Sequence, residues 1–145
     1  MDDLTLLPGS RTVLVVDDTS AVRITAFRML SEAGFRVFEA ASAAEALEVL
    51  QTARRPVDLI VMDVVMPEVS GVDLVHTIKD RWPDIPVLFM SGYQAEVLVR
   101  EGLERPDVLF LAKPFTRAEL LSKVVGAIRN QSKRNGQSAR KGREQ

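Results

Sequence analysis

The stretch Asp58 to Asp63 (DLIVMD) constrains this chain most, because four apolar residues run directly into a carboxylate. A continuous apolar run bounded by turn signals is typical of a strand buried on both faces of a parallel sheet, and Met66-Pro67 supplies the turn. We therefore predict that Asp63 stands at the carboxyl end of a central strand. Ligands bind at that edge in open α/β sheets, so Asp63 is a functional candidate, although an aspartate that merely begins a turn fits the same pattern.

Strand-like and helix-like patterns alternate along the rest of the chain. Further strands are predicted at Thr12 to Val16, Phe35 to Ala40, Pro86 to Met90 and Val108 to Leu111. Apolar residues at helical spacing predict helices over Thr19 to Ala33, from Ser42, from residue 71, over Gln94 to Leu103 and from Thr116. Ser42 with Glu45, and Thr116 with Glu119, have the spacing of capping boxes. Five strands alternating with five helices predict an α/β fold, with a parallel sheet between two helical layers.

Length and composition indicate one domain. The 145 residues, 46% of them hydrophobic, can bury a core of ordinary size. We place the domain at 11–130, after a flexible lead-in over 1–10 that contains Pro8-Gly9. The segment 131–145 holds five Lys or Arg residues and one Glu. We interpret it as a disordered basic tail, in preference to a tether for nucleic acid.

Several classes of site and location are excluded or disfavoured. The chain has no cysteine, so it forms no disulfide and no thiolate metal site, and His76 alone cannot make a histidine-rich one. We expect His76 to face solvent, one step off the apolar face of its helix. No apolar run approaches the length of a membrane span, and the N-terminus lacks the basic region of a secretory signal. We therefore expect a cytoplasmic protein without membrane contact.

Five chemically active residues follow or end the predicted strands: Asp17, Asp18, Asp63, Ser91 and Lys113. Because the carboxyl ends of parallel strands meet at one edge of a sheet, we expect these side chains to share that edge. Clustered carboxylates repel one another unless a cation neutralises them, and oxygen-only ligands with water access suit Mg²⁺. A carboxylate can accept a phosphoryl group as an acyl phosphate, with a lysine and a hydroxyl stabilising its charge.

Five motifs together resemble the receiver domain of two-component response regulators. They are Leu14-Val15-Val16-Asp17-Asp18, Met62-Asp63, Met66-Pro67 followed by Gly71, Met90-Ser91-Gly92, and Lys113-Pro114-Phe115. The resemblance covers about residues 12–129. It implies a flavodoxin-like (βα)5 three-layer sandwich with strand order 2-1-3-4-5, and a cis bond between Lys113 and Pro114.

The resemblance also implies a role for each matching residue. Asp63 would be phosphorylated by a histidine kinase or a histidine phosphotransfer protein. Mg²⁺ would be bound directly by Asp18, Asp63 and the backbone carbonyl of Val65, and through water by Asp17. Ser91, Gly92 and Lys113 would contact the phosphoryl oxygens. The domain would be a signalling module that assists its own phosphotransfer and dephosphorylation, not an enzyme.

Switching is a further implication of the resemblance. Ser91 would move toward the phosphoryl group, and Phe110 would fill the vacated space, although a simple core role for Phe110 fits as well. The responding face would be the fourth helix, fifth strand and fifth helix, where an unknown downstream protein or a second copy, forming a homodimer, would bind. Val65 and Tyr93 flank the phosphoryl site, and their apolar and bulky side chains predict a fairly long-lived phosphorylated form.

Three alternatives remain beside a stand-alone regulator. The chain could be the receiver fragment of a hybrid sensor kinase, which motifs such as Val87-Leu88-Phe89-Met90-Ser91-Gly92-Tyr93 resemble. An aspartyl-phosphate hydrolase of the haloacid dehalogenase type is disfavoured, because Val65 stands where that family needs a second acid. A phosphate-independent interaction module is disfavoured by the complete set of acids, serine and lysine.

Overall fold

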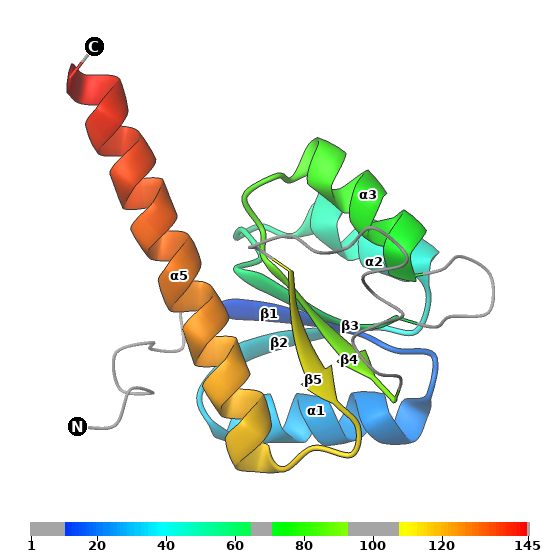
Figure 1. Ribbon diagram of the computed structural model, residues 1–145. Helices are drawn as coiled ribbons and strands as arrows, with labels where there is room; N and C mark the ends of the chain where they lie inside the picture. The colour runs from blue at the N-terminus through cyan, green and yellow to red at the C-terminus, as the bar shows by residue number, and fades with distance from the viewer. Residues whose placement is uncertain (1–10, 65–70, 93–107, 145) are drawn as a thin grey trace.

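Five parallel strands form the centre of the molecule (Figure 1). The computed structural model describes residues 11–64, 71–92 and 108–144. The strands are β1 (Thr12–Val16), β2 (Arg36–Ala40), β3 (Leu59–Asp63), β4 (Val87–Ser91) and β5 (Val108–Ala112). All neighbouring pairs are parallel and the order is β2-β1-β3-β4-β5, which confirms the predicted topology. Every residue of β1 and β4 is buried, including the polar Thr12 and Ser91 at their ends, as expected of apolar central strands in a parallel sheet.

Helices cover both faces of this sheet, which gives three layers. They are α1 (Ser20–Glu32), α2 (Ala43–Thr52), α3 (Gly71–Arg81) and α5 (Arg117–Glu144). In Figure 1, α1 and α5 lie on one face of the sheet, and α2 and α3 lie on the other. The helix predicted over Gln94 to Leu103 falls outside the described residues.

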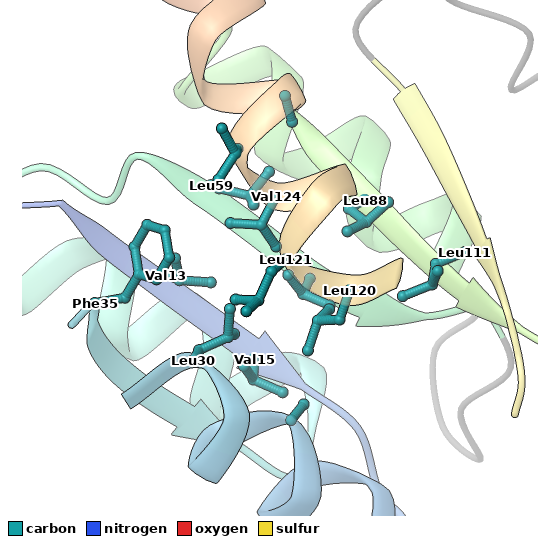
Figure 2. Close-up of a cluster of buried hydrophobic side chains, with 14 of the residues drawn as sticks. Val13, Val15, Leu30, Phe35, Leu59, Leu88, Leu111, Leu120, Leu121 and Val124 are labelled. Carbon is teal, nitrogen blue, oxygen red and sulfur yellow. The ribbon is translucent and has the colours of Figure 1, made fainter. Parts of the chain in front are cut away.

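The alternation of side chains along β1 divides the core into two. Val13 and Val15 point toward α1 and α5, where they meet a cluster that includes Leu30 and Leu120 (Figure 2). Leu14 and Val16 belong to the opposite cluster, which includes Leu74 and Ile78 of α3. Since both faces of the central strands are packed, the strand ends, and the polar residues that follow them, are held in fixed positions.

Local capping sets the limits of the helices. Ser42 Oγ accepts from the Glu45 backbone N–H at 3.2 Å, which is one of the two hydrogen bonds of the first predicted capping box. Thr116 Oγ1 accepts from the Glu119 N–H at 3.1 Å, and the Glu119 carboxylate accepts from the Thr116 N–H at 2.9 Å. Gly34, with φ of 102°, ends the first helical segment in a backbone conformation that favours glycine.

The end of the chain differs from the disordered tail that its composition predicted. Helix α5 continues through residues 131–144 and extends well past the sheet (Figure 1). Propagation of a helix that is already nucleated costs little, and 131–144 contains no proline to interrupt it. Among the described residues, none of the helices combines the length and apolar character that crossing a bilayer requires.

Candidate functional site

Three aspartates meet at the carboxyl edge of the sheet. Asp17 and Asp18 directly follow β1, and Asp63 ends the adjacent strand β3, whose Met62 is in register with Val16. One carboxylate oxygen of each aspartate lies within 4.8 Å of the others. Asp17 is fully buried and Asp18 is exposed, so the cluster runs from the protein interior to solvent. The predicted acidic edge is therefore present.

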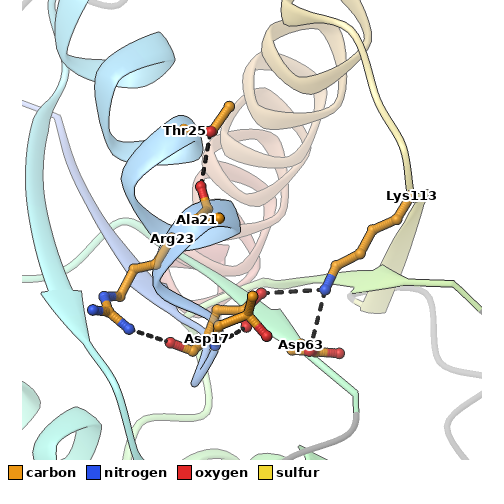
Figure 3. Close-up of polar contacts among 7 residues, drawn as sticks. Asp17, Ala21, Arg23, Thr25, Asp63 and Lys113 are labelled. Atoms are coloured by element: carbon orange, nitrogen blue, oxygen red, sulfur yellow. Dashed lines mark hydrogen bonds and ion pairs between the residues drawn. The ribbon is translucent and has the colours of Figure 1, made fainter.

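Lys113 bridges two of these acids. Its Nζ lies 3.2 Å from Oδ2 of Asp17 and 3.2 Å from Oδ2 of Asp63 (Figure 3). Lys113 follows β5, and its backbone N–H donates to the carbonyl oxygen of Ser91 at 2.9 Å, which continues the β4–β5 pairing. The peptide bond between Lys113 and Pro114 is cis, as predicted.

Burial and charge oppose each other in this cluster. Burial raises the pKa of Asp17 above its ordinary value, and the N–H of Thr19 at 2.8 Å and the ammonium of Lys113 only partly offset it. Burial disfavours the charged form of Lys113 too, but the carboxylates of Asp17 and Asp63 outweigh it and raise the pKa of this lysine. Lys113 is therefore protonated at neutral pH.

The donor set fits a hard divalent cation. Three carboxylates face a single ammonium group, so the cluster keeps an excess of negative charge when all three acids are ionised. All side-chain donors are oxygens, and the exposed Asp18 leaves the cluster open to water, which suits the several waters that Mg²⁺ retains. Val65, whose carbonyl was predicted as a further ligand, lies outside the described residues.

The remaining predicted site residues lie on or beside β4 and β5. Ser91 ends β4, is 4% exposed and stands in register with Ala112, next to Lys113. Gly92 follows it and is exposed. Phe110 is half-buried and stacks on Phe89, with ring centroids 6.2 Å apart and planes at 15°, so in this conformation it packs as part of the core. Their roles in phosphate binding and switching stay predictions.

Sequence reasoning missed two groups beside the acids. Arg23 of α1 donates from Nη1 to the carbonyl oxygen of Asp17 at 2.7 Å (Figure 3). A mostly apolar hollow of about 380 Å³ also adjoins the site, lined by Ala21, Val22, Thr25, Lys113, Pro114 and Phe115. The Arg23 contact depends on how α1 packs beside β2 and the turn after β1, and the hollow depends on how α1 packs beside the loop between β5 and α5, so no local sequence pattern predicts either. His76 is exposed, as predicted.

A doubly wound sheet with three acids and a lysine at its carboxyl edge defines an α/β domain whose clustered acids could hold a metal ion. The family model for the response regulator receiver domain matches residues 13–125, so this chain belongs to the receiver domains of two-component systems. This family is a signalling family rather than one of classical enzymes. Its members bind Mg²⁺ in the acidic pocket and interact with histidine kinases or phosphotransfer proteins.

Individual relatives agree with the family. The chain is 39% identical over 131 residues to sensor kinase CckA from Brucella abortus, which covers 90% of this chain and 14% of CckA. A response regulator receiver protein from Sinorhizobium medicae has a TM-score of 0.74 and 28% identity, over 83% of this chain and 96% of that one. Chemotaxis protein CheY4 from Vibrio cholerae has a TM-score of 0.72 and 31% identity, over 79% and 95%. The chain spans about half or less of the curated relatives that it matches.

Proposed function

We propose that Asp63 accepts a phosphoryl group from a phosphohistidine of a histidine kinase or histidine phosphotransfer protein. The observation that carries this proposal is the Lys113 ammonium, 3.2 Å from the carboxylates of Asp63 and Asp17 at the carboxyl edge of the sheet. Asp63 is half-buried at a strand end, where a donor can reach it, whereas Asp17 is fully buried and held by Thr19. Asp63 is therefore the better placed nucleophile of the two acids that Lys113 contacts.

In the proposed reaction, a carboxylate oxygen of Asp63 attacks phosphorus, and an O–P bond forms. The P–N bond of the donor breaks, its electron pair returns to the imidazole nitrogen, and the product is an acyl phosphate on Asp63. The Lys113 ammonium stabilises negative charge on the transferred oxygens, and the Ser91 hydroxyl and the Gly92 N–H donate to them. Hydrolysis of the acyl phosphate by water later resets the domain.

Mg²⁺ would be held by Asp18, Asp63 and the Val65 carbonyl directly and by Asp17 through water. Bound there, it supplies neutralising charge for the carboxylates and for the incoming phosphoryl group. Asp17, whose side chain accepts from the Thr19 N–H and from Lys113, would act by holding its oxygens in place.

The donor protein would dock on the apolar hollow between α1 and the loop that follows β5. Ala21, Thr25 and Phe115 line this hollow together with Lys113, so a protein seated there brings its histidine close to Asp63. The 39% identity to CckA supports a receiver in a phosphorelay, either in a hybrid kinase or as a separate protein. The cytoplasm remains our expectation for its location.

Reductive trapping tests the identity of the acceptor. Borohydride reduces an acyl phosphate to an alcohol, so treatment of the phosphorylated protein should convert residue 63 to homoserine, detected by peptide mass mapping. Homoserine at position 17 or 18 in place of 63 would overturn the assignment.

The output of the phosphorylated form also remains a proposal. Phosphorylation would draw Ser91 inward and shift Phe110 from its stack on Phe89, which changes the surface of β5 and α5. A downstream protein or a second copy would recognise this surface together with the fourth helix, which lies outside the described residues. Val65 and Tyr93, proposed to prolong the phosphorylated state, also lie outside them.

A further inference from the structure

An arginine ties together three elements beside the acidic cluster. Arg23 on α1 donates from Nη1 to the Asp17 carbonyl oxygen at 2.7 Å, and its Nε lies 3.4 Å from Oε1 of Glu39 on β2. The Arg23 side chain is only 18% exposed. This two-point contact therefore links α1 and β2 to the turn that follows β1.

The carbonyl that Arg23 holds belongs to the peptide joining Asp17 to Asp18. Asp17 has other restraints, because its N–H donates to the Ala40 carbonyl at 3.1 Å and its carboxylate accepts from Thr19 and Lys113. Asp18 is exposed, and its side chain makes no hydrogen bond or ion pair with the described part of the chain. The direction of the Asp18 side chain thus depends on the orientation of the peptide before it.

We infer that Arg23 is a positioning residue for Asp18: it fixes the Asp17–Asp18 peptide so that the Asp18 carboxylate faces the cation site. This inference rests on the proposed metal role of Asp18. Groups behind metal ligands typically change metal affinity by about 10–100-fold when removed.

Whether Mg²⁺ affinity rises or falls when Arg23 is replaced separates a positioning role from a purely electrostatic one. Arg23 carries a positive charge near the acidic cluster, so loss of that charge alone would make Mg²⁺ bind more tightly. Loss of a positioning contact would make Mg²⁺ bind more weakly. Arg23→Met removes both the charge and the contact and retains much of the apolar stem, so its effect reports which role dominates.

The experiment measures the unfolding temperature of the full chain as a function of MgCl2 concentration, because a cation that binds only the folded state raises it. The variants are Arg23→Met, Arg23→Lys, Asp18→Asn and, as a matched control, Arg28→Met, which removes an exposed arginine from the same helix. Each metal-free unfolding curve first establishes that the variant is folded.

We expect Arg23→Met to need about tenfold more Mg²⁺ than the wild type for the same rise in unfolding temperature. This is the lower end of the range of affinity changes for groups behind metal ligands. Arg23→Lys should fall between Arg23→Met and the wild type, because an ammonium keeps the charge but loses the planar two-point geometry. Arg28→Met should match the wild type. Tighter Mg²⁺ binding by Arg23→Met, or wild-type binding by that variant, would overturn the inference alone. A wild type without any response, or a full response in Asp18→Asn, would overturn the proposed metal role and the inference with it.

Discussion

Asp17 is held by several contacts, and Lys113 is the cation that makes the burial of its carboxylate tolerable. A carboxylate without exposure is costly unless it is paired and hydrogen-bonded, and Asp17 has both the Lys113 ammonium and the Thr19 N–H. The same ammonium also reaches Asp63. Lys113 thus stabilises the resting fold and competes with any metal for the same carboxylates.

Replacement of Lys113 by Met should therefore change stability and metal binding in opposite directions. Without metal, we expect a loss of roughly 1–3 kcal/mol in the free energy of unfolding, because the buried carboxylate of Asp17 loses its partner. Mg²⁺ should restore more stability than in the wild type, because no ammonium competes with it. Denaturant unfolding with and without MgCl2 measures both effects, and Lys123→Met, at an exposed position of α5, is the control. A weaker response to Mg²⁺ in Lys113→Met would contradict this competition.

For single residues, the sequence was a good guide to the positions of side chains at the ends of strands. Asp17, Asp18, Asp63, Ser91 and Lys113 were predicted to share one edge because parallel strands leave no other arrangement. Arg23 could not be predicted, because its partners are a backbone carbonyl in a turn and a glutamate on β2. Such contacts arise from the packing of α1 and not from spacing along the chain.

Among the elements, α1 and α5 stabilise the face of the sheet below the site. Leu30 of α1 is fully buried with Val15 and Leu120 in the cluster of Figure 2. The acids lie at the ends of strands that are packed against these helices. The rigidity of this packing therefore determines how well the acids keep their positions.

Leu30→Ala should cost about 2–5 kcal/mol in the free energy of unfolding, since it removes buried methyl groups and leaves a cavity. Ile24→Ala on the same helix is the control, because Ile24 is 43% exposed and its truncation should cost well under about 1 kcal/mol. Urea denaturation measures both values. Equal losses for the two variants would show that α1 does not pack as described.

The capping box that begins α5 predicts a dependence of stability on pH. Hydrogen bonds from the backbone N–H and the hydroxyl of Thr116 lower the pKa of Glu119. A carboxyl whose pKa is lower in the folded state stabilises the fold above its unfolded pKa, and this contribution is lost as pH falls through the lowered value. On acidification from neutral pH, the unfolding temperature should therefore fall more in the wild type than in Glu119→Gln. The control is Glu48→Gln, at an exposed position within α2, and equal pH profiles for Glu119→Gln and wild type would refute the prediction.

The helix limits show where local sequence is informative and where it is not. Both capping-box pairs were readable from the sequence, because each pair lies within one turn of its helix. The extension of α5 over 131–144 was predicted wrongly from composition, since a polar, charged segment suits both a disordered tail and a helix that continues from a packed one.

For the whole molecule, the order of strand-like and helix-like segments predicted the fold. The same segments do not reveal the proteins with which it works. Alternation of five apolar runs with helical segments predicted a parallel sheet with right-handed crossovers, and the family resemblance implied the strand order. The kinase, the downstream protein and the length of the natural protein leave no comparable pattern, and the chain spans only 14% of CckA. The apolar hollow beside the acidic cluster is the structural feature that bears on binding partners.

Docking at the apolar hollow can be separated from chemistry at Asp63. Ala21→Arg places bulk and charge on an exposed part of the hollow and should lower the rate of transfer from a phosphorylated protein donor by tenfold or more, on the order of 1.4 kcal/mol. Phosphorylation by acetyl phosphate, which needs no docking surface, should remain near the wild-type rate. Ser31→Arg, at an exposed position further along α1, is the control. An equal loss of phosphorylation rate with the protein donor and with acetyl phosphate would mean that Ala21→Arg damages the acidic cluster itself.

The mass of the intact protein after incubation with acetyl phosphate and Mg²⁺ shows whether Asp63 is a metal-assisted phosphoacceptor. We expect the wild type to gain the mass of one phosphoryl group, to gain nothing when Mg²⁺ is chelated, and Asp63→Asn to gain nothing. A gain of the same size in Asp63→Asn, or a gain that is independent of Mg²⁺, would contradict this role of Asp63.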